Sequence, residues 1–282
     1  MKRGFTNARE TAYPGTQAVL RAVAILKAFS DAQPEWRVTD LARTLGLNKT
    51  TAFRLLTALE SEGMVARNPA TNVYRLGPEA VALGAQALRS SGLRTLARPE
   101  LERLARETGE TATLEVLAGD DVLILDEAGG RFVVGTSPEV GTRWPAYATS
   151  TGKLLLAAAQ HGRLAAPNVA TDIPARFPQR TPRSITTRKR LLEELDRIWR
   201  QGYATAIGEL EEGFTAIAAP ISDHDGRVTA AMSLGGFKAR MPKERLPELA
   251  ALVIAACDRI SRQLGGGRAH GPRLVALPGG AR

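Results

Sequence analysis

Four residues between positions 49 and 54 have side chains that suit recognition of double-stranded DNA. Lys49, Thr50, Thr51 and Arg54 combine two cations with two short hydroxyls, and no carboxylate follows until Glu60. Arginine can form two hydrogen bonds with guanine, threonine can contact a thymine methyl, and lysine can neutralise a phosphate. We therefore expect Thr50, Thr51 and Arg54 to contact bases and Lys49 to contact a phosphate of a DNA duplex.

The surrounding sequence predicts two short helices that would present these side chains on one face. Leucine and alanine residues recur at helical spacing in residues 38–62, on both sides of a turn that contains Gly46. Thr39 or Asp40 can cap the first helix, Gly46 can end it, and Asn48 can cap the second. This spacing is typical of a helix-turn-helix. A plain helical hairpin with a solvated polar face is the alternative for this segment by itself.

Residues 64–76 predict a β-hairpin directly after the second helix. Two short arms flank a polar loop, and the order helix, helix, hairpin is that of a winged helix. Arg67, Asn72 and Tyr74 lie on this hairpin. We expect all three to be DNA contacts, with Arg67 and Tyr74 holding phosphates or the adjacent groove. The hairpin favours the DNA-binding interpretation over the plain helical hairpin.

The charge of the chain supports an acidic partner. Its 282 residues carry 38 Lys and Arg against 29 Asp and Glu, a formal charge of +9 with a pI of about 10.2. Residues 1–90 hold twelve of the basic residues against seven acidic ones, and residues 265–282 add three arginines without an acid. The excess therefore lies at the predicted DNA-binding end and in the tail.

Cysteine and histidine usage gives no sign of a metal or cofactor. Cys257 is the single cysteine, so internal disulfides and multi-cysteine zinc sites are excluded, and its place on the apolar seam of a late helix predicts buried packing. His161, His224 and His270 are scattered. No apolar run approaches the roughly 20 residues of a membrane span, and the N-terminus lacks a signal-peptide core. We expect a cytoplasmic protein without metal or cofactor.

Residues 150–153, Ser-Thr-Gly-Lys, have the residue types of two reactive motifs. A phosphate-binding loop would need glycine in place of Tyr147 and Ser or Thr in place of Leu154, and the serine–lysine hydrolase motif lacks its companion sequences. We therefore expect no enzymatic activity. A helix that begins at Ser150 instead offers free N–H groups to an anion. With an apolar wall from Trp144 and Tyr147, it suits a small carboxylate, including an aromatic one. The alternative is that Ser150 caps the helix and Trp144 lies in the core.

The second half of the chain predicts an α+β domain with a mostly antiparallel sheet and helices packed against it. The proline-rich segment 161–185 is expected to run over the surface, and Glu209, Glu211 and Glu212 to form a solvated acidic loop. The expected elements are helices 99–106, from 150, 187–201 and 246–264, and strands 111–118, 121–128, 131–134, 203–207, 214–221 and 227–234.

The predicted organisation has five parts. They are a flexible N-terminal arm (1–15), a winged helix-turn-helix domain (16–77), a linker helix with dimer contacts (78–91), the α+β domain (92–264) and a disordered tail (265–282). In the first domain, a helix over residues 17–29 with Val19, Ala22, Val23, Leu26 and Phe29 on its inner face is expected to support the helix-turn-helix.

Five stretches, taken together in this order and spacing, indicate a family. They are Leu41-Ala42-Arg43-x-x-Gly46-Leu47-x-Lys49-x-Thr51-x-x-Arg54-Leu55-Leu56, Tyr74-Arg75-Leu76-Gly77, Ala148-x-x-x-Gly152-Lys153-x-Leu155-Leu156-Ala157, Gly202-Tyr203 and Gly213-x-x-x-Ile217-Ala218-Ala219-Pro220-Ile221. From about residue 16 to residue 265 the chain resembles the IclR family of bacterial transcription regulators.

The resemblance implies a winged-helix DNA reader joined by a helix to a GAF-like effector domain. It also implies homodimers, often paired into tetramers, on palindromic or repeated operators of catabolic genes. Family members with known ligands bind small acids or aromatic compounds in the second domain. The positions that match their pocket are Val133, Thr136, Trp144, Ser150, Thr151, Ala206, Ala216, Ser233 and Gly235.

The chain departs from the glyoxylate-responsive members of the family at three of these positions. Ala206, Ala216 and Gly235 stand where those members carry a carboxylate, a thiol and a second hydroxyl, and Ser233 alone keeps its polar group. A less polar pocket with Trp144 favours a larger, more apolar ligand than glyoxylate. Two other functions stay open, namely a small-molecule sensor or interaction module whose helix-turn-helix contacts only protein, and a hydrolase that uses residues 150 and 153.

Overall fold

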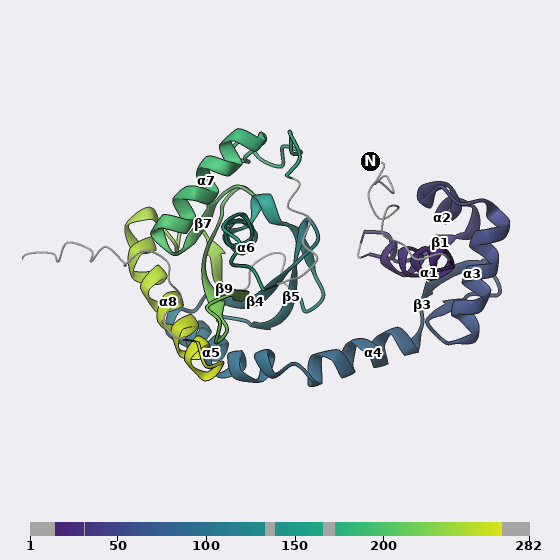
Figure 1. Cartoon of the computed structure of the whole chain (residues 1–282), viewed down its shortest axis with the longest axis horizontal. Helices are drawn as coiled ribbons and strands as arrows, with labels where there is room; N and C mark the ends of the chain where they lie inside the picture. Colours follow the sequence, from purple (N-terminus) through teal and green to yellow (C-terminus); the bar gives the residue numbers. More distant parts are fainter. Residues whose placement is uncertain (1–14, 31, 133–138, 166–172, 267–282) are drawn as a thin grey trace, which may run out of the picture. The chain divides into compact units, whose positions relative to one another are not determined.

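The computed structural model describes residues 15–30, 32–132, 139–165 and 173–266. The chain divides into two compact units at Ser90 and Ser91 (Figure 1). Val133 and Thr136, most of the predicted N-terminal arm and nearly all of the predicted tail lie outside the described residues. Within the described part of the chain, no helix is long and apolar enough to cross a membrane.

The N-terminal unit is a winged helix with one strand more than the sequence predicts. Its small sheet has the order β1-β3-β2, because Trp36 and Arg37 pair with Tyr74 and Val73. The elements are α1 (Gln17–Lys27), β1 (Trp36–Arg37), α2 (Val38–Leu45), α3 (Lys49–Ser61), β2 (Val65–Arg67), β3 (Val73–Leu76) and α4 (Pro78–Arg89).

Local signals place the two central helices where the sequence predicts them. Gly46 ends α2 at a φ of 64°, in the left-handed region that glycine adopts easily. Asn48 caps α3, because its Oδ1 accepts a hydrogen bond of 2.7 Å from the backbone N–H of Thr51. The predicted cap of α2 is wrong. Its N-cap position is Arg37, no side chain caps it, and Asp40 lies inside the first turn.

The core of this unit corrects the predicted inner face of α1. Ile25 and Phe29 are buried, whereas Val19 and Val23, predicted to face inward, are exposed by 63% and 41%. α1 packs against α2 and α3, and the side that carries Ile25 contacts Leu41 and Leu56. The buried core consists of Ile25, Phe29, Leu41, Leu56, Val65 and Tyr74.

The C-terminal unit has three layers built on one antiparallel sheet of the order β6-β5-β4-β9-β8-β7 (Figure 1). α5 and α8 cover one face, and α6, with α7 packed on it, covers the other. The elements are α5 (Gly92–Thr108), β4 (Thr111–Ala118), β5 (Asp121–Ala128), β6 (Arg143–Pro145), η1 (Ala146–Ala148), α6 (Ser150–Gln160), α7 (Arg188–Gln201), β7 (Ala204–Ile207), β8 (Phe214–Ser222), β9 (Val228–Phe237), η2 (Lys243–Arg245) and α8 (Leu246–Gln263).

Several predicted boundaries in this unit change. α5 begins at Gly92, not Pro99, because Ser91 caps it by accepting a hydrogen bond from Arg94 N, and Pro99 lies inside the helix. Arg131 and Phe132 form a bend, so the predicted strand 131–134 is wrong over its described part. The irregular stretch before α6 contributes the edge strand β6. Cys257 is buried as predicted, and burial raises the pKa of its thiol.

The predicted disordered tail begins too early. Residues 265 and 266 are described, and their backbone N–H groups donate to the carbonyls of Arg262 and Ser261 at the end of α8. These bonds satisfy two of the orphan carbonyls that every helix end presents. The first two residues of the segment 265–282 therefore extend the C-terminal end of α8.

Candidate functional site

The solvent-facing side of α3 carries the residues that the sequence predicts for DNA recognition. Lys49, Thr50 and Arg54 are exposed, and no ion pair or hydrogen bond of their side chains occurs within the described residues. Thr51 is half-buried, and its backbone N–H is held by the cap at Asn48. Three of the four predicted side chains are therefore free to meet a partner, and the fourth lies at the edge of the same face.

Phe53 is a residue of this face that the sequence analysis missed. Its side chain is 47% exposed and belongs to neither the buried core nor the residues packed against it. On a helix, residues three and four apart are neighbours, so Phe53 lies beside Lys49 and Thr50. The sequence signal for Phe53 is a bulky aromatic residue among polar ones.

The wing, which is the hairpin formed by β2 and β3, presents Arg67 and Asn72 together. Arg67 Nη2 donates a hydrogen bond to Asn72 Oδ1, and both residues are exposed. Asn72 has a φ of 54°, a conformation that asparagine tolerates better than most residues. Asn72 therefore shapes the tip of the wing and holds the guanidinium of Arg67 at the surface.

The prediction that Tyr74 contacts DNA is wrong. Its side chain is 1% exposed and lies in the core with Leu41, Leu56 and Val65. Burial raises the pKa of its phenol, against a smaller opposing effect of the Arg67 charge. Successive residues of a strand face opposite sides, so the pairing of β3 that exposes Arg75 turns Tyr74 inward.

A pocket in the C-terminal unit gathers all the described residues that the sequence assigns to effector binding. These seven are Trp144, Ser150, Thr151, Ala206, Ala216, Ser233 and Gly235. The other lining residues, which the sequence analysis did not place there, are Thr111, Thr113, Glu115, Ala148, Thr149, Glu209, Leu210 and Phe214. The cavity volume is about 30 Å³, so a ligand larger than a few atoms requires side chains to move. The larger ligand that the sequence predicts therefore also requires side chains to move.

The register of the sheet explains why residues so distant in sequence meet at this pocket. Ala206 pairs with Ala216, Ala216 with Gly235, and Gly235 with Thr111, across β7, β8, β9 and β4. Thr113 pairs with Ser233 in the row beside it. Directly paired residues point to the same side of a sheet. A row of small side chains therefore leaves space, and the start of α6 closes that space from above.

α6 begins at Ser150 as predicted, and the alternative in which Ser150 caps the helix is wrong. Thr149 is its N-cap, with Oγ1 accepting from Gly152 N at 3.1 Å, so Ser150 is the first helical residue and does not cap. A Cβ at Gly152 would lie 2.2 Å from the carbonyl oxygen of Ala146. Glycine at this position therefore lets the first turn of α6 pack directly on η1, which places residues 150 and 151 against the sheet.

Only one of the two aromatic residues predicted to form the pocket wall lines the pocket. Trp144 lines the pocket. Tyr147 does not, because its ring stacks on Phe177 with centroids 4.6 Å apart and its hydroxyl donates to the carbonyl of Pro178 at 2.7 Å. Trp144 lies in the edge strand β6, whereas Tyr147 lies in η1, so the two side chains belong to different elements and contact different neighbours.

Glu115 is the most consequential pocket residue that the sequence analysis missed. It lies on β4, is 1% exposed, and accepts hydrogen bonds from Thr113 Oγ1 at 2.6 Å and Thr151 Oγ1 at 2.5 Å. Ser233 Oγ lies 3.4 Å from Oε1. Burial raises the pKa of this carboxyl, and the three hydroxyls oppose that effect without cancelling it. The pocket is therefore less apolar than the substitutions at positions 206, 216 and 235 suggested.

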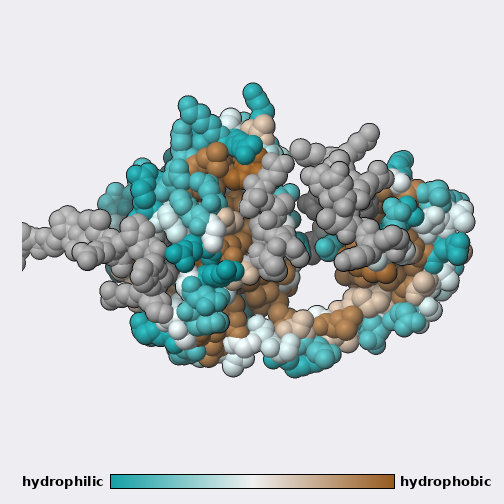
Figure 2. Space-filling model, viewed as in Figure 1, coloured by the Kyte–Doolittle hydropathy of each residue, from teal (hydrophilic) through white to brown (hydrophobic). Residues whose placement is uncertain are grey.

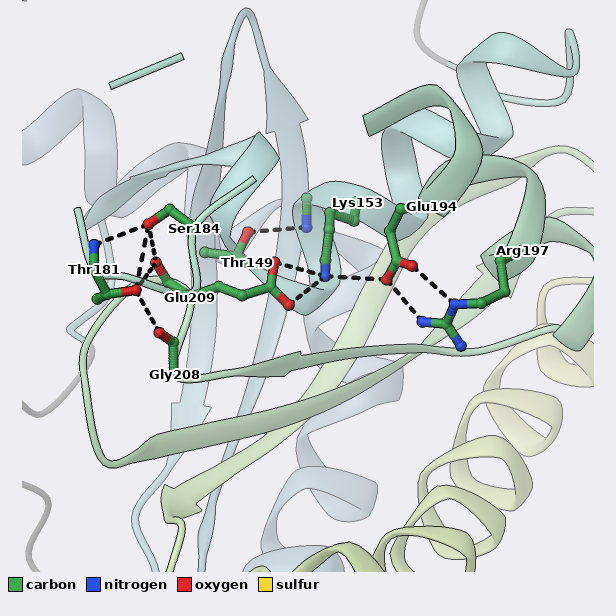
Figure 3. A network of polar contacts seen from close by, with 9 residues as sticks. Thr149, Lys153, Thr181, Ser184, Glu194, Arg197, Gly208 and Glu209 are labelled. Carbon is green, nitrogen blue, oxygen red and sulfur yellow. Dashed lines mark hydrogen bonds and ion pairs between the residues drawn. The ribbon is translucent and has the colours of Figure 1, made fainter. Parts of the chain in front are cut away.

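An ion network around the buried Lys153 adjoins the pocket through Glu209, and Figure 3 shows its contacts. Lys153 is fully buried, and its Nζ lies 2.6 and 2.8 Å from the two carboxylate oxygens of Glu209 and 3.3 Å from Glu194. Arg197 also binds Glu194, which lowers the pKa of Glu194 although burial acts in the opposite direction. The pKa of Glu209 is raised by burial, with Lys153 opposing. The predicted solvated acidic loop is therefore wrong for Glu209.

The segment before α7 is also less superficial than predicted. Thr181 and Ser184 are buried, and their hydroxyls donate to the carbonyls of Gly208 at 2.6 Å and Glu209 at 2.8 Å (Figure 3). These bonds hold the loop between β7 and β8 in place. Residues 181–184 therefore hold Glu209 through its backbone carbonyl, and Lys153 holds it through its carboxylate.

The reactive motifs weighed from the sequence gain no support from this geometry. Lys153 Nζ is occupied by two carboxylates, and no hydrogen bond joins it to Ser150 in the described structure. Asp223, His224 and Asp225 bring possible metal ligands together among the described residues. Asp223 Oδ1, however, accepts from the N–H groups of residues 225 and 227, which is the bonding of an ordinary turn. The absence of metal and cofactor stays a prediction.

Comparisons with known proteins agree with the two-part architecture. The family model for the IclR helix-turn-helix domain matches residues 18–69, and that for the C-terminal domain of bacterial IclR regulators matches residues 85–262. The transcriptional regulator XynR of Escherichia coli is 31% identical over 252 residues, which cover 89% of this chain and 98% of that protein.

Solved structures extend the similarity to three dimensions. An IclR regulator from Alicyclobacillus acidocaldarius has a TM-score of 0.73 at 28% identity, over 88% of this chain and 98% of that one. An IclR homologue from Microbacterium hydrocarbonoxydans, solved with 4-hydroxybenzoate, has a TM-score of 0.67 at 28% identity, over the same shares of the two chains. With both domain models matched in order along one chain, this protein belongs to the IclR family of bacterial transcription regulators.

Proposed function

We propose that this protein regulates catabolic genes by coupling a small molecule in the Glu115 pocket to operator binding by α3 and the wing. As an IclR family member it is a DNA-binding transcription regulator with an effector domain. The observation that supports effector binding is the pocket itself, which gathers seven predicted residues from five elements, β6, α6, β7, β8 and β9. Their convergence under the first turn of α6 favours a ligand site over a filled core.

The exposed face of α3 is the part that reads the operator. Arg54 and Thr50 contact bases in the major groove, Thr51 contacts them at the edge of the face, and Lys49 contacts a phosphate. Phe53 adds an apolar contact with a thymine methyl. On the wing, Arg67 contacts a phosphate from the position in which Asn72 holds it. Tyr74 has no direct part in this recognition, because it is buried.

Exposed apolar residues on two helices of the N-terminal unit favour a homodimer. Val19, Leu20 and Val23 on α1, and Val81 and Leu83 on α4, are each at least 40% exposed. Figure 2 shows hydrophobic residues along the exposed surface of α4. A second copy of the chain can cover this surface, and two readers then bind a two-fold or repeated operator. A dimer of dimers is the larger assembly.

The effector is a small organic molecule, with organic and aromatic acids as the first class to test. The relative solved with 4-hydroxybenzoate supports this choice. The bonding of Lys153 supports a role without catalysis, because its Nζ is bonded to two carboxylates rather than to Ser150. Operator binding requires access to the chromosome, which supports a location in the cytoplasm.

One experiment tests this function as a whole. Aromatic and aliphatic acids are screened for a shift in the melting temperature of the full chain, and each hit is then added to a gel-shift titration on the DNA upstream of the gene. We expect a hit to change operator affinity at least several-fold and to lose its effect in Trp144→Ala. Binding to upstream DNA that no ligand of the pocket alters would contradict the coupling. Failure to bind DNA in a salt-sensitive manner would contradict the assignment of α3 and the wing as the DNA-binding surface.

A further inference from the structure

One polar corner of the pocket is acidic. Glu115, Thr113, Thr151 and Ser233 form it, and no lysine, arginine or histidine is among the described residues that line the pocket. Lys153, the buried cation of the neighbouring network, has its Nζ bonded to Glu209 and Glu194. Glu115 is therefore a buried carboxyl without a cationic partner, an arrangement that proteins rarely keep unless something else satisfies the group.

The hydroxyls around Glu115 leave part of its capacity unused. A carboxylate offers about four acceptor positions on its two oxygens. Thr151 supplies one donor to Oε2, and Thr113 supplies one to Oε1. Ser233 is 2.7 Å from Thr113 Oγ1 and only 3.4 Å from Oε1, so its hydrogen is better placed for Thr113 than for Glu115. At least one acceptor position on Glu115 is free for a donor that enters the pocket.

The same geometry restricts where an anion can bind. Thr151, in the first turn of α6, contacts Glu115 directly. A ligand carboxylate at the N–H groups of that turn would lie close to the Glu115 carboxylate, and two like charges in a buried site repel each other strongly. Any acidic group of the ligand must therefore point away from this corner.

We propose that Glu115 determines the specificity of the pocket by selecting an effector that presents a hydroxyl or amino hydrogen-bond donor to it from an apolar body. Trp144, Leu210 and Phe214 also line the cavity and contact that body. The inference rests on the proposed function, in which this pocket holds the effector. It adds the chemical class of the group that the effector must carry and the residue that recognises it.

The test uses small benzene derivatives that differ in one substituent, with the full-length protein at pH 8. Dissociation constants are measured by ligand-observed NMR for phenol and benzylamine, which offer a donor, and for anisole and benzoate, which do not. We expect phenol or benzylamine to bind at least tenfold more tightly than anisole, and benzoate to bind no better than anisole. Comparison of phenol with benzylamine distinguishes a neutral hydroxyl from a cationic amine as the preferred donor.

Variants show whether Glu115 causes the preference. Glu115→Met should reduce the ratio of the anisole and phenol dissociation constants to near one. Glu212→Met, which removes an exposed carboxylate of the same unit, should leave the ratio unchanged. Glu115→Gln keeps an acceptor oxygen without charge and should give an intermediate ratio. Thr151→Val keeps the carboxylate and removes one competing donor, so it should preserve or increase the ratio even if Glu115→Met does not fold.

Three results would overturn the inference. Benzoate could bind more tightly than phenol, the tenfold ratio could persist in Glu115→Met and Glu115→Gln, or none of the four probes could bind. The proposed function fails in a different way. A library hit that occupied the pocket with the Glu115 preference, but left operator affinity unchanged, would refute the coupling and leave the specificity of the pocket standing.

Discussion

Lys153 Nζ lies 2.6 and 2.8 Å from the two carboxylate oxygens of Glu209, although the residues belong to different parts of the fold. Lys153 is in the first turn of α6, and Glu209 is in the loop between β7 and β8. Both segments border the pocket, and Glu209 lines it directly. The pair therefore fixes the distance between the helix that covers the pocket and the loop at its rim.

Removing the cation from this pair should destabilise the protein strongly. In Lys153→Met, Glu209 and Glu194 stay partly buried without Lys153, and breaking a buried pair in this way costs about 3–5 kcal/mol. The measurement is equilibrium urea denaturation of the full chain. Arg106→Ala is the control, because Arg106 is exposed and lies 3.8 Å from Glu102, and it should cost less than about 1 kcal/mol. Adding Glu209→Leu to Lys153→Met should recover stability, since Glu194 keeps Arg197. If Glu209→Leu and Lys153→Met instead lowered the free energy of unfolding additively, the pairing would be contradicted.

The buried carboxyl of Glu115 should make stability depend on pH. Burial raises the pKa of Glu115 from its ordinary value of 4.5, so the folded chain binds more protons than the unfolded chain between the two pKa values. The contribution of this group to the free energy of unfolding is therefore greatest below pH 4.5 and is lost as pH rises through the folded pKa. Glu115→Gln cannot ionise, so its stability relative to wild type should increase from pH 4.5 to 8. Parallel denaturation curves over this range would exclude the effect.

Arg54 should contribute to base specificity. Arg54→Ala is expected to lose about 1–3 kcal/mol of operator affinity and to relax the preference at one base pair, because an arginine fork on guanine is lost. Gel-shift titrations on the operator and on its single-base variants measure both effects. Tyr74→Phe is the matched control, since Tyr74 is buried and should leave DNA affinity unchanged. Unaltered affinity and specificity in the Arg54 variant would refute the assignment.

Lys49 should contribute to DNA affinity independently of the base sequence. Lys49→Ala is expected to weaken binding equally on operator and unrelated DNA, because a phosphate contact carries no base information. The slope of log affinity against log salt concentration should fall by about one. Fluorescence anisotropy at several salt concentrations measures the slope. A slope equal to that of the wild type would show that Lys49 makes no phosphate contact.

Phe53 should recognise a thymine methyl group. Replacing thymine by deoxyuridine one position at a time in a selected operator removes single methyl groups, and we expect one position to lose about 0.8 kcal/mol in the wild type. In Phe53→Ala that position should become insensitive to the replacement. Thr57→Ala is the comparison variant on the same face, and it should keep the sensitivity because the Thr57 hydroxyl is bonded within α3. Equal deoxyuridine effects in wild type and Phe53→Ala would contradict the contact.

The winged helix was largely predictable because its signals are local. Asn48 caps a helix three residues ahead of the N–H that it binds, and Gly46 ends a helix by its own backbone freedom. Helical spacing of leucine and alanine residues places Lys49, Thr50 and Arg54 on the outer face without further information. The exceptions within this unit, Tyr74 and the inner face of α1, depend on which neighbours each element meets.

The amino-acid sequence by itself determined the family, the two helices of the DNA reader and the seven described positions of the pocket. Only the tertiary structure showed that Glu115 faces the pocket, that Lys153 is bonded to Glu209 and that Tyr74 is buried. Glu115 lies in a strand that is buried on both faces, so periodicity could not assign its side. Lys153 and Glu209 meet through the packing of α6 on the sheet. Such contacts depend on strand register and helix packing, which join residues far apart in the chain. Helix caps and helical periodicity depend only on residues that are close in sequence.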